Sequence, residues 1–153
     1  MNKKQVKIIV VFLQAFLVGA MFLPAGRIIE GAGQGDSSLS VFGMIQRYAG
    51  MGFSDDARFF MIFACIFPVA IVCCILFLKE RINFGSATIL SAFYACASAC
   101  FFSASRTKLV DYATMTVLPY IIVFVSLVSM MIQILGFFYA APNSADKSGD
   151  AKG

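Results

Sequence analysis

The sequence of 153 residues contains no histidine and no tryptophan, and only 13% of its residues are charged. Soluble domains carry about 25% charged residues. With 60% hydrophobic residues the chain is too apolar for a soluble globular domain, and its 17 phenylalanines exclude a disordered one. No short repeat of the collagen or coiled-coil kind is present. An integral membrane protein is the class that remains.

Charge is also missing from the interiors of four long apolar segments. A hydrocarbon core of about 30 Å requires roughly 20 apolar residues in a helix. The segments that meet this requirement are residues 6–23, 59–78, 84–104 and 114–140. They predict an all-α integral membrane fold: an up-down-up-down bundle of four transmembrane helices, forming one domain over residues 1–140. The polar residues 141–153 are predicted to be a disordered tail.

The first segment has a second interpretation as a cleaved signal peptide. Three lysines precede its apolar run, and small residues follow that run. We favour a retained span, because three further apolar segments follow it in place of a soluble domain.

Lysine and arginine near the ends of the spans set the orientation. Three lysines and no acid open the chain, and Lys79 and Arg81 lie in the short turn between the second and third spans. The long loop after the first span holds four of the eight acids. Both termini are therefore predicted to be cytoplasmic, in a membrane that we expect to be a bacterial inner membrane.

The loop between the first two spans contains a short amphipathic pattern. Apolar residues recur there at every third position: Leu39, Phe42, Ile45 and Tyr48. This spacing predicts a helix over about residues 39–49, with N-cap side chains from Asp36 to Ser38 and a left-handed end at Gly50. Its apolar face is expected to cap the outer end of the bundle or to lie among the lipid headgroups. Binding of a partner protein is the alternative.

The lack of ionisable groups inside the spans limits the possible chemistry. Proton relays, ion-coupled transport and voltage sensing depend on such groups, and hydrolysis usually needs histidine, a carboxylate or a metal ion. We therefore expect a non-enzymatic protein with no cofactor and no metal. The net charge of +4 follows from the flanks of the spans, and no basic run with interleaved aromatic residues predicts nucleic-acid binding.

Five uncharged polar residues are predicted to lie inside the spans: Gln14, Tyr94, Ser126, Ser129 and Gln133. The three in the last span share one helix face, which Gly136 extends. Hydrogen bonding between helices, worth about 0.6 to 2 kcal/mol per bond in a membrane, is the favoured interpretation. A ligand site is the alternative. Pro68 and Pro119 predict helix kinks, and a pocket is expected between Pro68, Tyr94 and Gln14.

The third span carries small residues at every fourth position. One such stripe contains Ser91, Ala95, Ala99 and Ser103. Small residues let helix backbones approach closely, which favours helix association in lipid. We therefore expect the third span to be the central helix of the bundle and this stripe to be its packing surface.

All five cysteines lie in the second and third spans, which excludes disulfide bonds in the outer loops: Cys65, Cys73, Cys74, Cys96 and Cys100. Three of them, Cys65, Cys96 and Cys100, are expected at a similar depth, where thiolates could bind a soft metal ion. No CxxC motif and no histidine support such a site. Packing as small apolar residues is the favoured interpretation.

The first span ends on Phe22, Leu23 and Pro24, and the loop after it contains the sequence SLSVF at residues 38–42. This pattern resembles small uncharacterised four-helix bacterial membrane proteins. The resemblance covers the first third of the chain. It implies a four-helix membrane fold and no particular function.

These observations favour a non-enzymatic scaffold or accessory subunit. Small-residue helix faces would pack against a second copy of the chain or a partner membrane protein. The alternative is a carrier or binder of a neutral or lipidic molecule, held in a mid-membrane pocket near Gln14 and Tyr94. A membrane-active or immunity-type protein is a third possibility.

Overall fold

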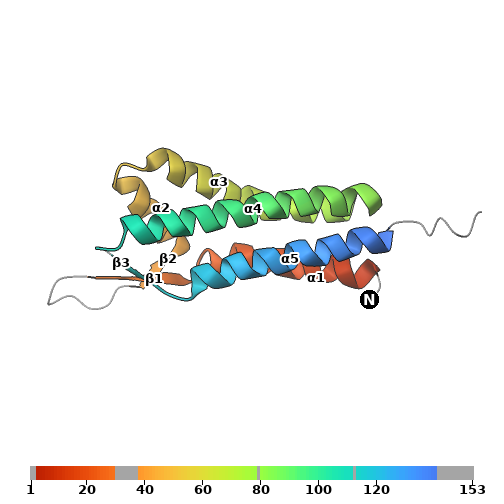
Figure 1. Cartoon of the computed structure of the whole chain (residues 1–153), viewed down its shortest axis with the longest axis horizontal. Coiled ribbons are helices and arrows are strands. Elements are labelled where there is room, and N and C mark those ends of the chain that lie inside the picture. The colour runs from red at the N-terminus through yellow and green to blue at the C-terminus, as the bar shows by residue number, and fades with distance from the viewer. Residues whose placement is uncertain (1–2, 30–37, 79, 112, 141–153) are drawn as a thin grey trace, which may run out of the picture.

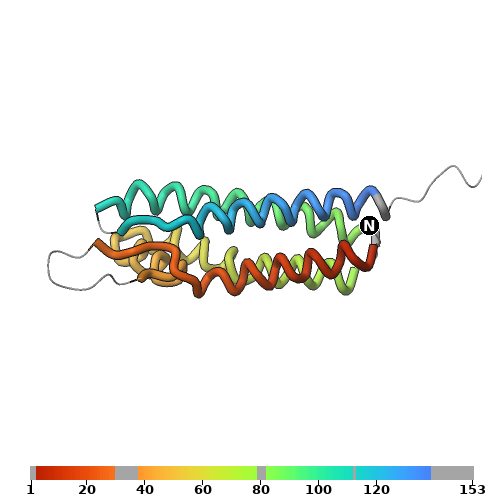
Figure 2. Tube along the Cα trace, turned by 90° about the horizontal axis from the view of Figure 1, so that it is seen from below, coloured from red at the N-terminus to blue at the C-terminus, as the bar shows by residue number. Residues whose placement is uncertain are grey.

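The computed structural model describes residues 3–29, 38–78, 80–111 and 113–140, which are mostly helical. Four long helices run alternately along the molecule (Figure 1): α1 (Lys3–Ala20), α3 (Ser54–Phe77), α4 (Glu80–Lys108) and α5 (Leu118–Ala140). α4 packs against α3 and α5, and α1 packs against the same two helices. The start of α1 and the end of α5 lie at the same end of the bundle (Figure 2), which we call the terminal end. The predicted tail, residues 141–153, lies outside the described residues.

Three of the long helices are apolar and long enough to cross a membrane, over Ser54–Phe77, Ile82–Lys108 and Leu118–Phe138. α1 differs because its 18 residues include three lysines near its start. The helix bounds differ from the predicted spans by one to five residues at every end except the last. The first helix ends at Ala20 rather than at residue 23, and the last begins at Leu118 rather than at residue 114.

The prediction of an all-α fold was wrong at the other end of the bundle, which we call the cap end. A three-stranded antiparallel sheet lies there in the order β2-β1-β3, formed by β1 (Pro24–Ile28), β2 (Ser38–Ser40) and β3 (Ala113–Met115). Gly26 pairs with Leu39 on one side and with Met115 on the other. A Cβ atom at Gly26 would lie 3.1 Å from the carbonyl oxygen of Thr114, so a residue without a side chain suits this contact.

Helix α2 (Val41–Gly50) closes the cap end. It packs against α3, β1 and β2 through its buried face, Val41, Met44, Ile45 and Tyr48, as the capping alternative predicts. The predicted caps were wrong. The side chain of Ser40 accepts a hydrogen bond of 3.1 Å from the backbone N–H of Gly43, while Ser38 lies in β2 and residues 36 and 37 lie outside the described part. Gly50 is helical, and Gly52 takes the left-handed conformation, with φ 98°.

The buried residues form two clusters along the bundle. The cluster at the cap end is aromatic: the rings of Phe60 and Phe101 stack with centroids 4.0 Å apart, and Tyr48 from α2 contacts Phe101 edge-on at 5.5 Å. Burial, and secondarily the Asp56 carboxylate, raise the pKa of Tyr48, so its phenol stays neutral. The cluster at the terminal end is mainly aliphatic and includes Ile75 together with the ring of Phe84.

The two prolines have different positions within their helices. Pro68 lies inside α3, as predicted. Pro119 is the second residue of α5, where a missing N–H costs no helical hydrogen bond. The predicted kink near the outer end of the fourth span was therefore wrong.

Candidate functional site

A buried chain of hydrogen bonds connects three helices in the interior of the bundle. Gln14 Nε2 on α1 donates to Ser129 Oγ on α5 over 2.8 Å, and Gln133 Nε2 donates to the same oxygen over 3.0 Å. Ser91 Oγ on α4 donates to Gln133 Oε1 over 3.0 Å. All four side chains are buried. We call this set the polar seam, and its geometry fits the role of joining helices.

The other two polar residues singled out in the sequence lie outside the seam. The hydroxyl of Ser126 donates to the carbonyl oxygen of Ile122 in its own helix, over 2.7 Å. Tyr94 is buried, and among the residues that the structure describes neither its hydroxyl nor Oε1 of Gln14 has a hydrogen-bond partner. The structure thus brings together three of the five residues and adds Ser91, which the sequence had placed only in the packing stripe.

The packing stripe of α4 is buried in its first half and exposed in its second half. Ser91 and Ala95 are buried, whereas Ala99 and Ser103 are exposed. Residues four apart are rotated by about 40° on a helix, so three such steps from Ser91 to Ser103 amount to about 120°. Buried serines instead recur every seven residues, at Ser91, Ser98 and Ser105, a spacing that drifts by only about 20° per step. The expectation that the whole stripe is a packing surface within the bundle was therefore wrong for its second half.

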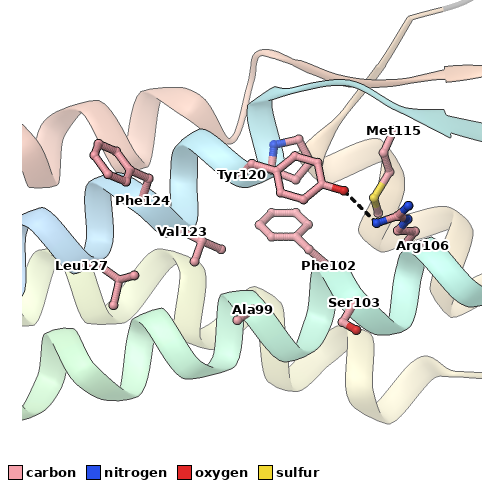
Figure 3. A pocket seen from close by; sticks show the side chains of 10 residues that line it. Ala99, Phe102, Ser103, Arg106, Met115, Tyr120, Val123, Phe124 and Leu127 are labelled. Carbon is pink, nitrogen blue, oxygen red and sulfur yellow. Dashed lines mark hydrogen bonds between the residues drawn. The ribbon is translucent and has the colours of Figure 1, made fainter.

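An open groove of about 370 Å³ lies between α4 and α5 where the stripe becomes exposed. Ala99 and Ser103 form its α4 side, while Val123, Phe124 and Leu127 rise from α5 (Figure 3). Several of these side chains are exposed, including Phe124 at 66%. The groove therefore opens on the side of the bundle rather than into its interior, and its lining is almost entirely apolar.

The cap end of this groove carries its polar groups. Arg106 Nη1 donates a hydrogen bond of 3.1 Å to the hydroxyl oxygen of Tyr120, as the dashed line in Figure 3 shows. Arg106 belongs to the last turn of α4 and Tyr120 to the first turn of α5. Both side chains are exposed. The groove is therefore apolar over its length and cationic at one end.

The pocket predicted between Pro68, Tyr94 and Gln14 is present only in part. A second open groove, of about 410 Å³, runs between α1 and α3 and is lined by Gln14 and Pro68 together with Val69. Tyr94 does not line it, because Tyr94 belongs to the cap-end core.

The cysteines are all free, and four of the five are exposed, with Cys74 half-buried. The four exposed cysteines are not buried contacts between the helices of the bundle, so the predicted packing role was wrong for these four. Within the part of the chain that the structure describes, no group of three or more metal-ligating side chains is present.

Sequence reasoning missed Arg106 and Tyr120 as site residues. Arg106 follows the third apolar segment, and an arginine at the end of a span is common and by itself indicates only orientation. The sequence feature that could have indicated this contact is the separation of 14 residues between Arg106 and Tyr120, which lies near the start of the next span. Two antiparallel helices joined by a short connection bring such residues to the same end of a bundle.

The arrangement offers apolar surface, a cation and hydroxyl groups, which can bind a molecule with an apolar body and a polar end. Comparison of the chain with protein-family models, with curated proteins and with solved structures finds no match in any of the three.

Proposed function

We propose that this is a small polytopic membrane protein that holds the acyl chain of a bilayer lipid in the α4–α5 groove and carries out no reaction on it. The groove itself supports this proposal, with about 370 Å³ of space against apolar walls. It lies on the side of two helices that are apolar enough to cross a membrane. Lipid chains surround such helices in a bilayer, so an acyl chain is the apolar molecule most available to the groove.

The length of the groove favours a lipid chain over a partner helix. Its lining on α4 extends from Ala99 to Arg106, which is about 10 Å along a helix. The hydrocarbon core of a bilayer is about 30 Å thick. The groove thus reaches about a third of the way across and fits the upper part of one acyl chain within one leaflet.

The proposal includes a fourth span and an orientation. α1 has 18 residues, or about 27 Å of helix, and packs against both α3 and α5. Its lysines can extend along the helix to reach the headgroups. The lysines at the start of the chain support an orientation with both termini on the cytoplasmic side of a bacterial inner membrane.

Photolabelling tests the lipid-binding proposal. The full-length protein is reconstituted in nanodiscs with phosphatidylcholine that carries a diazirine in one acyl chain, and labelled peptides are identified by mass spectrometry. We expect labelling to concentrate on residues 120–127 and to fall several-fold in Ala99→Leu, whose side chain fills the groove. Cys96→Leu, also exposed on α4 but outside the groove, is the matched control. Uniform labelling of all exposed helix faces, or equal labelling of the two variants, contradicts the proposal.

An accessory subunit is the second candidate, because α4 exposes small residues over its cap half. Ala99 and Ser103 are joined there by Cys96 and Cys100, and small residues permit close approach of another helix. Oxidation with copper phenanthroline in native membranes tests this candidate. We expect a disulfide-linked adduct from a variant that retains only Cys100 and none from one that retains only Cys73, exposed on α3. Equal adducts from both variants, or none from either, contradict it.

A further inference from the structure

We infer that the α4–α5 groove selects a glycerophospholipid with an anionic headgroup, whose phosphate binds at Arg106 and Tyr120. This inference rests on the proposed function and adds the identity of the polar end of the ligand. It follows from the kind of groups at the cap end of the groove, from their place along the helices and from the apolar lining below them.

The cap end of the groove offers hydrogen-bond donors. A guanidinium group has five N–H donors and no acceptor. One N–H group of Arg106 donates to the hydroxyl oxygen of Tyr120. The hydroxyl hydrogen of Tyr120 remains available to donate to a ligand. No described carboxylate pairs with Arg106. A ligand group placed there must therefore bring acceptors, and a phosphate supplies several charged ones.

The hydrogen bond with Tyr120 also determines where the guanidinium lies. The side chain of Arg106 is exposed and long, and such a chain is otherwise free to turn away from the helix. The contact of 3.1 Å holds it over the end of the groove that lies between α4 and α5 (Figure 3). Tyr120 is thus a positioning residue for Arg106 as well as a donor.

The depth of the site fits a headgroup above an acyl chain. Arg106 lies in the last turn of α4, where a membrane-spanning helix reaches the headgroup region, and the apolar lining continues toward the middle of the helices to Ala99 and Leu127. A bound lipid would therefore place its phosphate and the upper part of one chain in their natural order along the membrane normal.

Native mass spectrometry of the full-length protein in mild detergent tests the selectivity. The probes are phosphatidylglycerol and phosphatidylcholine with identical chains, the corresponding diacylglycerol, and oleate. We expect the wild-type protein to retain phosphatidylglycerol over phosphatidylcholine by roughly three- to fivefold, the size expected of an exposed charged contact. Diacylglycerol and oleate should be retained less than phosphatidylglycerol.

The variants separate this site from general charge attraction. Arg106→Gln should abolish the preference for phosphatidylglycerol and should also lower retention of phosphatidylcholine, since both lipids carry the phosphate that the guanidinium binds. Tyr120→Phe should reduce the preference. Lys108→Gln is the matched control, since it removes one positive charge from the same helix end, where the ammonium lies 5.4 Å from the Phe53 ring and outside the groove. The control should keep the full preference.

The inference is overturned by an undiminished preference in Arg106→Gln, by an equal loss in Lys108→Gln, or by stronger retention of oleate than of phosphatidylglycerol. Equal retention of the two phospholipids by the wild-type protein overturns the inference but leaves the proposed chain-binding function intact. Retention of no lipid at all overturns both.

Discussion

Ser129 is the residue on which the polar seam depends, because two glutamines from different positions donate to its single hydroxyl oxygen. Its neighbour Ser126 is equally buried but bonds only within its own helix. The two serines are three residues apart on one helix face, so they differ in hydrogen bonding more than in surroundings. They provide a matched pair for measuring what the seam contributes to stability.

We predict that Ser129→Ala lowers the free energy of unfolding by about 1 to 2 kcal/mol, because it leaves the amide groups of Gln14 and Gln133 buried without this acceptor. Ser126→Ala should change it by less than about 0.5 kcal/mol, since only a bond to its own helix backbone is lost. Unfolding by titration with sodium dodecyl sulfate in micelles measures both values. Equal effects of the two substitutions would mean that the seam adds no stability beyond side-chain packing.

At the scale of the elements, α4 and α5 approach each other closely near the terminal end. A Cβ atom at Gly136 on α5 would lie 2.6 Å from the ring of Phe84 on α4. Phe84 is completely buried in the terminal-end core, so its ring has little room to move. Toward the cap end the same pair of helices leaves the groove between them. The tight contact and the open groove therefore belong to one helix pair.

We predict that Gly136→Ala destabilises the protein by about 1 to 3 kcal/mol, because the added methyl group overpacks the contact with Phe84. Gly19→Ala is the control: a Cβ atom there meets no atom of the described residues within 4 Å, so the substitution should be neutral or stabilising through its helix propensity. Thermal unfolding in detergent measures both changes. Stabilisation by Gly136→Ala would contradict the close contact, and a smaller side chain at Phe84 should relieve the effect.

The elements that could be predicted from the sequence are those that depend on nearby residues. The apolar runs predicted the four long helices, and the three-residue spacing from Leu39 to Tyr48 predicted α2 to within two residues. Ser129 and Gln133 were visible as one face because they are four residues apart. Their partners Gln14 and Ser91, the pairing of Gly26 with Met115, and the contact of Arg106 with Tyr120 depend on the spatial arrangement of distant segments. No local pattern encodes that arrangement.

At the scale of the whole molecule, the two ends of the bundle are built differently. The cap end combines α2, the sheet and an aromatic cluster, while the terminal end holds an aliphatic cluster and the ends of α1 and α5. Among the described charged residues, three lysines lie near the terminal end on α1. If the bundle spans a membrane, its two ends face different compartments.

We predict that reporter fusions to the N-terminus and to the C-terminus both report the cytoplasm, and that a fusion within the loop between β1 and β2 reports the opposite side. The reason is that α1 and α5 have their free ends at the same end of the bundle, next to the positive charges. Alkaline phosphatase and green fluorescent protein fusions give complementary readouts. Termini on opposite sides would contradict the four-span arrangement.

The sheet at the cap end also has a consequence for biogenesis. β1 leaves the end of α1, whereas its partner β3 is made only after α4, and the backbone N–H of Thr116 donates to the carbonyl oxygen of Ala25 over 2.9 Å. Until the ribosome has passed residue 116, one edge of β1 lacks its native strand and its backbone groups depend on other partners. The early loop can therefore reach its final form only when the last helical hairpin arrives, so a chain truncated before β3 lacks the completed cap.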